Sequence, residues 1–148
     1  MSNDLTVRET SDMMCLRLTA DGTAFELLLI ERLYEPFQGS WALPGGHRDI
    51  VDGKLEASRI AAVRELGEET NVIVDQDEPR FVGRYDAPGR DSRGDYRTEA
   101  YLVIVPAGTA AQAGDDAKTL RWFPLDQLPA GIAFDHARII ADGLKLVA

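Results

Sequence analysis

The sequence has a single cysteine, Cys15, among its 148 residues. One cysteine excludes an intrachain disulfide framework, and its apolar neighbours favour a buried thiol over a reactive one. No run of residues reaches the roughly 20 apolar positions that cross a bilayer. The N-terminus MSNDLTVRE also lacks the basic and apolar regions of a signal peptide. These absences predict a cytoplasmic protein that does not associate with a membrane.

Basic side chains are scarce, since 16 Lys and Arg residues stand against 25 Asp and Glu residues, for a formal net charge of -9. Binding to nucleic acid depends on basic residues that neutralise phosphates, so this composition disfavours a nucleic-acid partner. A small anionic substrate is compatible with it, because a divalent cation held by clustered carboxylates reverses the local charge.

A chain of this length fits one domain, residues 1–148, whose core needs no disulfide. Short apolar runs bounded by turn residues predict strands, and turn residues at 20–23 predict that the first two strands form a hairpin. The expected strands are 13–18, 25–33, 72–74, 80–87, 99–107 and 119–125, and the expected helices are 55–70 and about 135–147.

Loops are expected at 36–54 and 88–97, which are rich in Gly, Pro and polar residues. Asn71 follows the first helix, where a left-handed residue commonly closes a helix. Asp135 is placed to cap the second helix. The face of that helix expected to pack in the core consists of Ala137, Ile140, Leu144 and Val147.

The segment RELGEET places Glu65, Glu68 and Glu69 at helical positions i, i+3 and i+4, on one stripe. Each like-charge pair at this spacing destabilises a helix by roughly 0.2–0.5 kcal/mol. One interpretation is a solvated acidic face balanced by Arg59 and Arg64. The other is a cation site, because carboxylate oxygens suit magnesium or manganese.

The LPGG segment before the helix bears on this choice. Gly45 and Gly46 let the backbone approach a ligand closely, and a carbonyl oxygen there could join the same ion. Two glycines alone are typical of an ordinary turn. Together with the acidic helix, they favour a metal site.

Residues 45–72 resemble the signature of the Nudix hydrolases, which runs Gly, five residues, Glu, seven residues, then Arg-Glu-apolar-x-Glu-Glu-x-Gly-apolar. Glu56 stands eight positions before Arg64, as in the family, and the match continues through Glu69 to Val72. The resemblance implies a Nudix fold, an α+β protein arranged as an α/β/α sandwich with a mixed β-sheet between helices.

The sequence departs from that signature at two places. The loop at residues 47–55 is expanded by four residues, and Asn71 stands where the family has glycine. Asn adopts the left-handed backbone at modest cost, so we expect the site to be intact.

The resemblance also implies residue roles. Arg64 and Glu56 would orient the metal ligands, as supporting residues of a metal centre do. The catalytic residues would be Arg64, Glu68 and Glu69, and the ligands of Mg²⁺, or alternatively of Mn²⁺, would be the Gly45 carbonyl and the carboxylates of Glu65, Glu68 and Glu69.

Resemblance beyond the signature covers residues 12–146 and includes WFPLDQLP and FDHARII. It is to the branch that holds ADP-ribose pyrophosphatases and Nudix-derived regulators of NAD metabolism. The implied reaction is attack of water on a pyrophosphate phosphorus. Glu99 is the first candidate for the general base, ahead of Asp91 and Asp115, although an exposed strand carboxylate explains Glu99 equally well.

Substrate contacts are expected from charged and aromatic side chains. Arginines suit diphosphate oxygens, and aromatic rings can stack on a base. The candidates are Arg32, Arg90, Arg93 and Arg97 for polar contacts, and Tyr34, Phe37 and Trp41 for stacking, with Trp41 fitting the core better. The resemblance of the FDH segment to the same branch also implies a pocket contact from His136, although a place in the first turn of the last helix explains this residue as well.

We therefore expect a Mg²⁺-dependent pyrophosphohydrolase, with ADP-ribose as the favoured substrate. The alternatives are a pyrophosphatase that sanitises nucleoside triphosphates and a non-catalytic nucleotide sensor. The acidic charge and the expected lack of a DNA-binding domain after the last helix disfavour the sensor. A homodimer is compatible with the family, but no stretch of sequence demonstrates one.

Overall fold

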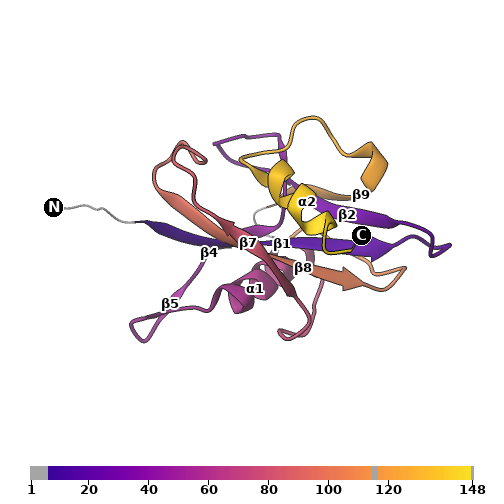
Figure 1. The fold of residues 1–148 in the computed structure, drawn as a ribbon, viewed down its shortest axis with the longest axis horizontal. Coiled ribbons are helices and arrows are strands. Elements are labelled where there is room, and N and C mark those ends of the chain that lie inside the picture. Colours follow the sequence, from indigo (N-terminus) through magenta and orange to yellow (C-terminus); the bar gives the residue numbers. More distant parts are fainter. Residues whose placement is uncertain (1–6, 115–116, 148) are drawn as a thin grey trace.

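The computed structural model describes residues 7–114 and 117–147. A mixed sheet forms the middle layer, with one helix on each face (Figure 1). No helix in these ranges has the length and apolar character to cross a membrane. The strands are β1 (Arg8–Leu18), β2 (Phe25–Arg32), β3 (Trp41–Ala42), β4 (Gly45–His47), β5 (Ile50–Val51), β6 (Lys54–Leu55), β7 (Arg80–Tyr85), β8 (Tyr96–Val105) and β9 (Ala117–Pro124); the helices are α1 (Ser58–Thr70), the short 3-10 helix η1 (Leu125–Gln127) and α2 (His136–Leu144).

The sheet is built around β1. Its main path runs β3-β2-β1-β8-β7, with β4 paired to β1 and β9 paired to β2. The β1–β8 pair is parallel, whereas β1–β2 is antiparallel, as the predicted hairpin requires. Strands β5 and β6 form a separate hairpin. The predicted mixed sheet between helices is confirmed.

Successive side chains of β1 point to opposite faces of the sheet, as in any pleated strand. Met13 and Cys15 pack in the cluster beneath α1, and Met14 and Leu16 pack in the cluster beneath α2. All four side chains are fully buried. Burial raises the pKa of Cys15 to about 12, which fits the expected structural thiol.

Helix α1 buries Ala62 and Leu66 against the sheet and ends as predicted. Asn71 closes it in the left-handed conformation, with φ 61°, and its N–H donates to the Gly67 carbonyl at 2.9 Å. The helix begins at Ser58, three residues later than predicted, because Leu55 pairs in the β5–β6 hairpin instead.

Helix α2 packs on the opposite face through Ile139, Ile140 and Gly143, all of which are buried. Of the four residues expected on its packing face, Ile140 is buried and Leu144 and Val147 pack against the same cluster, as predicted. The prediction is wrong at Ala137, which is exposed. Asp135 occupies the N-cap position, but its side chain makes no capping hydrogen bond.

Two further local predictions are wrong. Residues 72–74 form no strand; Val72 packs in the cluster beneath α1, whereas Ile73 is 81% exposed. Residues 36–54 are not irregular throughout, because they contain β3, β4, β5 and the first residue of β6. The pairing of β4 with β1 has consequences for the site.

Replacing Leu66 by Ala tests the packing of α1 on the sheet. Leu66 is fully buried in this layer, so the truncation should lower the free energy of unfolding by about 2–5 kcal/mol. Ile60 lies on the same helix and is 43% exposed, so Ile60→Ala should cost much less. Urea denaturation measures both changes, and equal losses would contradict this account of the core.

Candidate functional site

The three glutamates of α1 differ in environment although they share one stripe of the helix. Glu69 is buried, at 9% exposure. Glu65 is half-buried, and the side chain of Glu68 is 57% exposed. The stripe therefore runs from the surface at Glu68 into the interior at Glu69. A purely solvated acidic face would leave all three carboxylates exposed.

The backbone of β4 lies directly against these carboxylates. The Gly45 N–H donates to Glu69 Oε1 at 2.8 Å. Gly46 faces Glu65 so closely that a Cβ at this position would overlap its carboxylate. A side chain at Gly46 would therefore displace the Glu65 carboxylate. At Gly45, a Cβ would overlap the Ser11 carbonyl oxygen and the Asp12 Cα of β1, so glycine is required there.

Glu65 has an unusual acidity. Burial raises its pKa to about 7, and the neighbouring Glu68 carboxylate adds to the shift, while Arg64 opposes it. A cation bound beside this carboxyl group would favour its charged form and so lower the pKa again.

Arg64 organises the opposite edge of the stripe. Its guanidinium donates two hydrogen bonds to Glu56, at 3.0 and 2.9 Å, and one to the carbonyl of His47 at 3.0 Å. It also donates to Glu68 at 3.0 Å. The residues between His47 and Glu56 form the β5–β6 hairpin, so the expanded loop projects outward without breaking this pairing.

The residues present fit a hard divalent cation in their chemistry. Glu65 and Glu69 bring carboxylate oxygens against the Gly45–Gly46 backbone, and oxygen donors are those that Mg²⁺ and Mn²⁺ prefer. Among the described residues, no group of three or more His, Cys, Asp or Glu side chains converges as a ligand set. Glu68 lies with Arg64 and would have to turn to join an ion.

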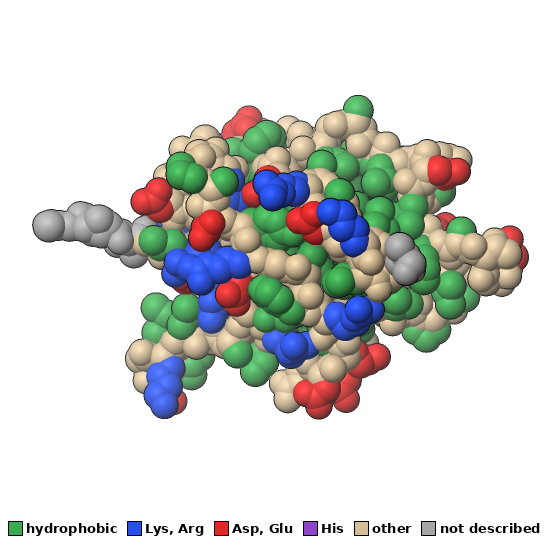
Figure 2. Space-filling model, in the orientation of Figure 1, with side chains coloured by type: hydrophobic (Ala, Val, Ile, Leu, Met, Phe, Trp, Pro, Cys, Tyr) green, Lys and Arg blue, Asp and Glu red, His purple; other side chains and the backbone are tan. Residues whose placement is uncertain are grey.

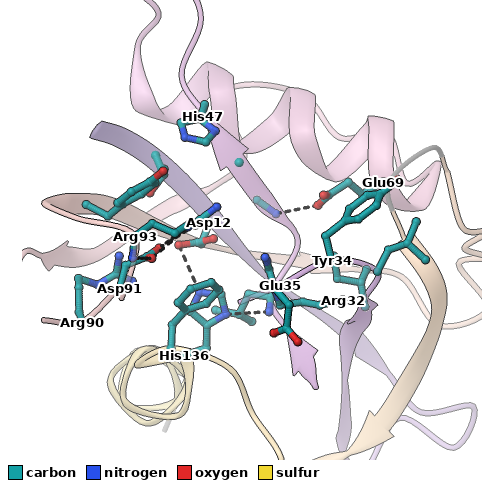
Figure 3. A pocket seen from close by; sticks show the side chains of 18 residues that line it. Asp12, Arg32, Tyr34, Glu35, His47, Glu69, Arg90, Asp91, Arg93 and His136 are labelled. Atoms are coloured by element: carbon teal, nitrogen blue, oxygen red, sulfur yellow. Dashed lines mark hydrogen bonds and ion pairs between the residues drawn. The ribbon is translucent and has the colours of Figure 1, made fainter. Parts of the chain in front are cut away.

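A pocket of about 320 Å³ opens beside Glu69 and β4 (Figure 3). Strands β1, β2 and β4, the 90–96 segment and the start of α2 all contribute side chains to it. Its polar lining residues include Asp12, Arg32, Glu69, Arg90, Asp91, Arg93 and His136.

The floor of the pocket is a buried polar network. Thr98 Oγ1 donates to Asp12 Oδ2 at 2.6 Å, and His136 Nε2 lies 3.6 Å from the same oxygen. His136 Nδ1 accepts the Leu43 N–H at 3.0 Å. Sequence reasoning missed Asp12; the available signal was a carboxylate next to the fully apolar run that begins at Met13.

Two of the predicted substrate arginines form ion pairs with nearby carboxylates, Arg90 with a buried side chain and Arg93 with an exposed one. Arg90, whose side chain is 5% exposed, donates to both Asp135 carboxylate oxygens at 2.8 and 2.6 Å. Arg93 donates to Asp91 at 3.0 and 2.7 Å and stacks on Tyr96, 4.4 Å from the ring centroid. Both line the pocket, but their charges are largely compensated.

Arg32 has a different environment. Its Nε donates to the Pro36 carbonyl at 2.7 Å, and the guanidinium lies over the Phe134 ring at 4.9 Å. Burial lowers the pKa of Arg32, and the charge of Arg93 adds to this effect. An anion in the pocket would therefore stabilise this cation.

Arg97 and Glu99 lie outside the pocket lining. Arg97 donates to Glu9. Glu99 is on the sheet face that carries α1, beside Ser11 of the parallel neighbour. The roles predicted for Arg97 and Glu99 stay predictions, and Asp115 lies outside the described residues.

The three aromatic candidates for stacking lie in different environments. Tyr34 lines the pocket and is 64% exposed. Phe37 packs edge-on against Phe134, with ring centroids 4.9 Å apart. Trp41 packs against the buried Phe123, also at 4.9 Å, so it belongs to the core as favoured.

Comparison with known proteins agrees with this geometry. The chain is 39% identical over 123 residues to an ADP-ribose pyrophosphatase of Methanocaldococcus jannaschii, covering 81% of this chain and 66% of that protein. It is 32% identical over 122 residues to an ADPR responsive transcriptional repressor, NtrR, of Acinetobacter baylyi, covering 80% of this chain and 46% of that one. The chain thus spans about two thirds and about half of these relatives.

A solved structure supports the fold assignment. The NUDIX domain of Shewanella oneidensis NrtR, in complex with ADP ribose, superposes with a TM-score of 0.81 at 26% identity, covering 97% of this chain and 90% of that one. The NUDIX domain itself matches residues 9–143. With the glutamate helix, the glycine strand and the mixed sheet all in place, the chain belongs to the NUDIX domain family.

Proposed function

We propose that this chain is a Mg²⁺-dependent pyrophosphohydrolase that cleaves a nucleoside diphosphate linked to a second group, with ADP-ribose as the favoured substrate. The observation that carries the proposal is the position of Glu65 and Glu69 against the Gly45–Gly46 backbone at the edge of the pocket. The M. jannaschii relative, an ADP-ribose pyrophosphatase, supports the substrate class.

The pocket residues would bind the substrate, and the glutamates would hold the ion. A volume of about 320 Å³ is within the usual range for small-molecule sites. Arg32 would bind a phosphate group, because burial leaves its charge poorly solvated. Arg90 and Arg93 would shape the wall through their pairs with Asp135 and Asp91.

In the proposed reaction, Glu65, Glu69 and the Gly45 carbonyl would hold the ion, with Glu68 as a further ligand or water contact. Mg²⁺ bound there would supply charge neutralisation for the diphosphate and for ionisation of the attacking water. Arg64 fixes the helix edge through Glu56 and orients the carboxylates.

The general base is proposed from the carboxylates outside the signature. Asp91 is poorly suited: burial would raise its pKa, but hydrogen bonds from Arg93 lower it below the ordinary range. Glu99 stays the first candidate, and the Mg²⁺ requirement, cytoplasmic location and homodimer likewise stay predictions.

A second candidate function is nucleotide sensing without cleavage. Two relatives favour it, the ADPR responsive repressor of A. baylyi and the NrtR domain in complex with ADP ribose. Acidic and basic side chains are interspersed on the face that bears α2 and β7 (Figure 2), so this face presents no extended basic surface for DNA. Catalysis is the better-supported function because the signature glutamates are all present.

A substrate panel tests the proposal. With Mg²⁺, the protein should convert ADP-ribose to AMP and ribose 5-phosphate, and EDTA should abolish turnover because the ion is needed for charge neutralisation. Chromatographic product analysis should include dinucleotides, nucleotide sugars and nucleoside triphosphates. Preference for triphosphates would favour the sanitising function, and tight binding of ADP-ribose without turnover would favour the sensor.

Replacing Glu69 by Gln should lower kcat by at least about 100-fold, because it removes a proposed ligand charge while the amide oxygen can still accept the Gly45 N–H. Steady-state kinetics with saturating Mg²⁺ measures the change. The matched control is Glu78→Gln, an exposed loop position, which should leave kcat unchanged. Full activity of the Glu69 variant would contradict the proposed ligand role.

The raised pKa of Glu65 predicts a pH dependence of stability in the metal-free protein. Its folded-state pKa of about 7 lies above the ordinary 4.5, so the linked stability is present below about pH 4.5 and is lost as pH rises through about 7. Wild type should lose more stability than Glu65→Gln between about pH 5 and about pH 8. Urea denaturation measures the difference, Mg²⁺ should restore wild-type stability at the higher pH, and identical pH profiles would refute the assignment.

A further inference from the structure

His136 is held rigidly at the start of α2. The residue is 4% exposed, its backbone N–H donates to the Ala133 carbonyl at 3.1 Å, and Phe134 packs beside the imidazole ring with centroids 5.4 Å apart. A side chain that packing and hydrogen bonds hold in one rotamer can fix the position of a group that is hydrogen-bonded to it.

The hydrogen bonds of His136 define its protonation. Nδ1 accepts the Leu43 N–H at 3.0 Å, so that nitrogen carries no proton. Nε2 then carries the proton and faces Asp12 Oδ2, which Thr98 holds from the other side. Burial lowers the pKa of His136, in keeping with a neutral ring, although Asp12 opposes the shift.

Leu43 begins a segment that is anchored from both faces of the sheet. The Leu43 amide is bound by His136 of α2, and the Gly45 amide is bound by Glu69 of α1. Between them, the Pro44 carbonyl accepts the Met13 N–H of β1 at 2.8 Å. Three consecutive residues are thus fixed by three different elements, and Figure 3 shows His136 and Glu69 on opposite sides of this segment.

We propose that His136 is a positioning residue, an uncharged acceptor that fixes the Leu43 amide and so holds Gly45 and Gly46 against Glu69 and Glu65. The catalytic part of this inference rests on the proposed pyrophosphohydrolase function. The role replaces the direct substrate contact expected from sequence, because Leu43 occupies Nδ1 and Asp12 stands opposite Nε2.

Loss of the hydrogen bond from the Leu43 amide to His136 would allow β4 to shift relative to α1. The ligand oxygens of the proposed site come from both elements, so a small shift would misplace them while Arg32 stays on β2. Loss of a residue that supports a metal centre typically lowers metal affinity or activity about 10- to 100-fold. The effect should therefore fall on kcat and on the Mg²⁺ requirement more than on KM.

Three substitutions separate the functions of the two ring nitrogens. His136→Asn keeps an acceptor near the position of Nδ1, His136→Gln places its amide farther out near Nε2, and His136→Leu removes both. The matched control is Arg138→Leu, on the same helix at 77% side-chain exposure. Each variant is assayed for kcat, KM and Mg²⁺ activation, and for hydrogen exchange at the Leu43 amide by NMR of the metal-free protein.

The expected result is faster Leu43 exchange and a kcat lowered about tenfold or more in His136→Leu and His136→Gln, with KM changed less than about threefold. His136→Asn should restore slow exchange and most of kcat, and Arg138→Leu should change neither. If His136→Leu fails to fold, His136→Gln provides the same comparison.

Two outcomes would overturn the inference. An increase in KM at unchanged kcat would assign His136 to substrate binding, and unchanged Leu43 exchange in both His136→Leu and His136→Gln would remove the structural basis. If the wild-type protein cleaves no member of the panel, the proposed function fails by itself. The exchange measurements then still decide whether His136 positions this segment.

Discussion

The backbone of Gly45 and Gly46 lies against the carboxylates of Glu69 and Glu65, and the rest of the site depends on this contact. It joins α1 to β4 through a 2.8 Å hydrogen bond and through the close approach of the Glu65 carboxylate to Gly46, where a Cβ would displace that carboxylate. Because β4 also pairs with β1, the contact fixes the acidic helix to the centre of the sheet. A buried glutamate is tolerated there because a backbone donor satisfies it.

Strand β1 links the core to the site because its alternate residues face opposite helices. Met14 and Leu16 pack beneath α2, and Asp12 continues the same face as a buried carboxylate at the pocket floor. The parallel pairing with β8 brings Thr98 within 2.6 Å of Asp12. The polar floor of the pocket thus continues the buried face of β1 that packs in the apolar core.

The expanded loop shows that the pairing of Arg64 with Glu56 does not depend on the length of the loop before Glu56. Arg64 and Glu56 form their double hydrogen bond although residues 47–55 contain four extra positions. The insertion is accommodated as the β5–β6 hairpin, outside the contact between helix and sheet. Asn71 likewise replaces a glycine without altering the helix end, since it adopts φ 61°. Both departures change length or residue type while leaving the bonded groups in place.

The sequence by itself determined the glutamate helix, its left-handed end at Asn71, the first hairpin and the family, because these follow from local periodicity and motif spacing. Only the tertiary structure decided that Arg90 pairs with Asp135, 45 residues away, that Asp12 forms the pocket floor, and that Arg97 and Glu99 lie outside the lining. Local spacing assigns a residue to one face of its own element. Which partner it meets depends on the elements that become neighbours, and those distant pairings are set by packing of the whole sheet.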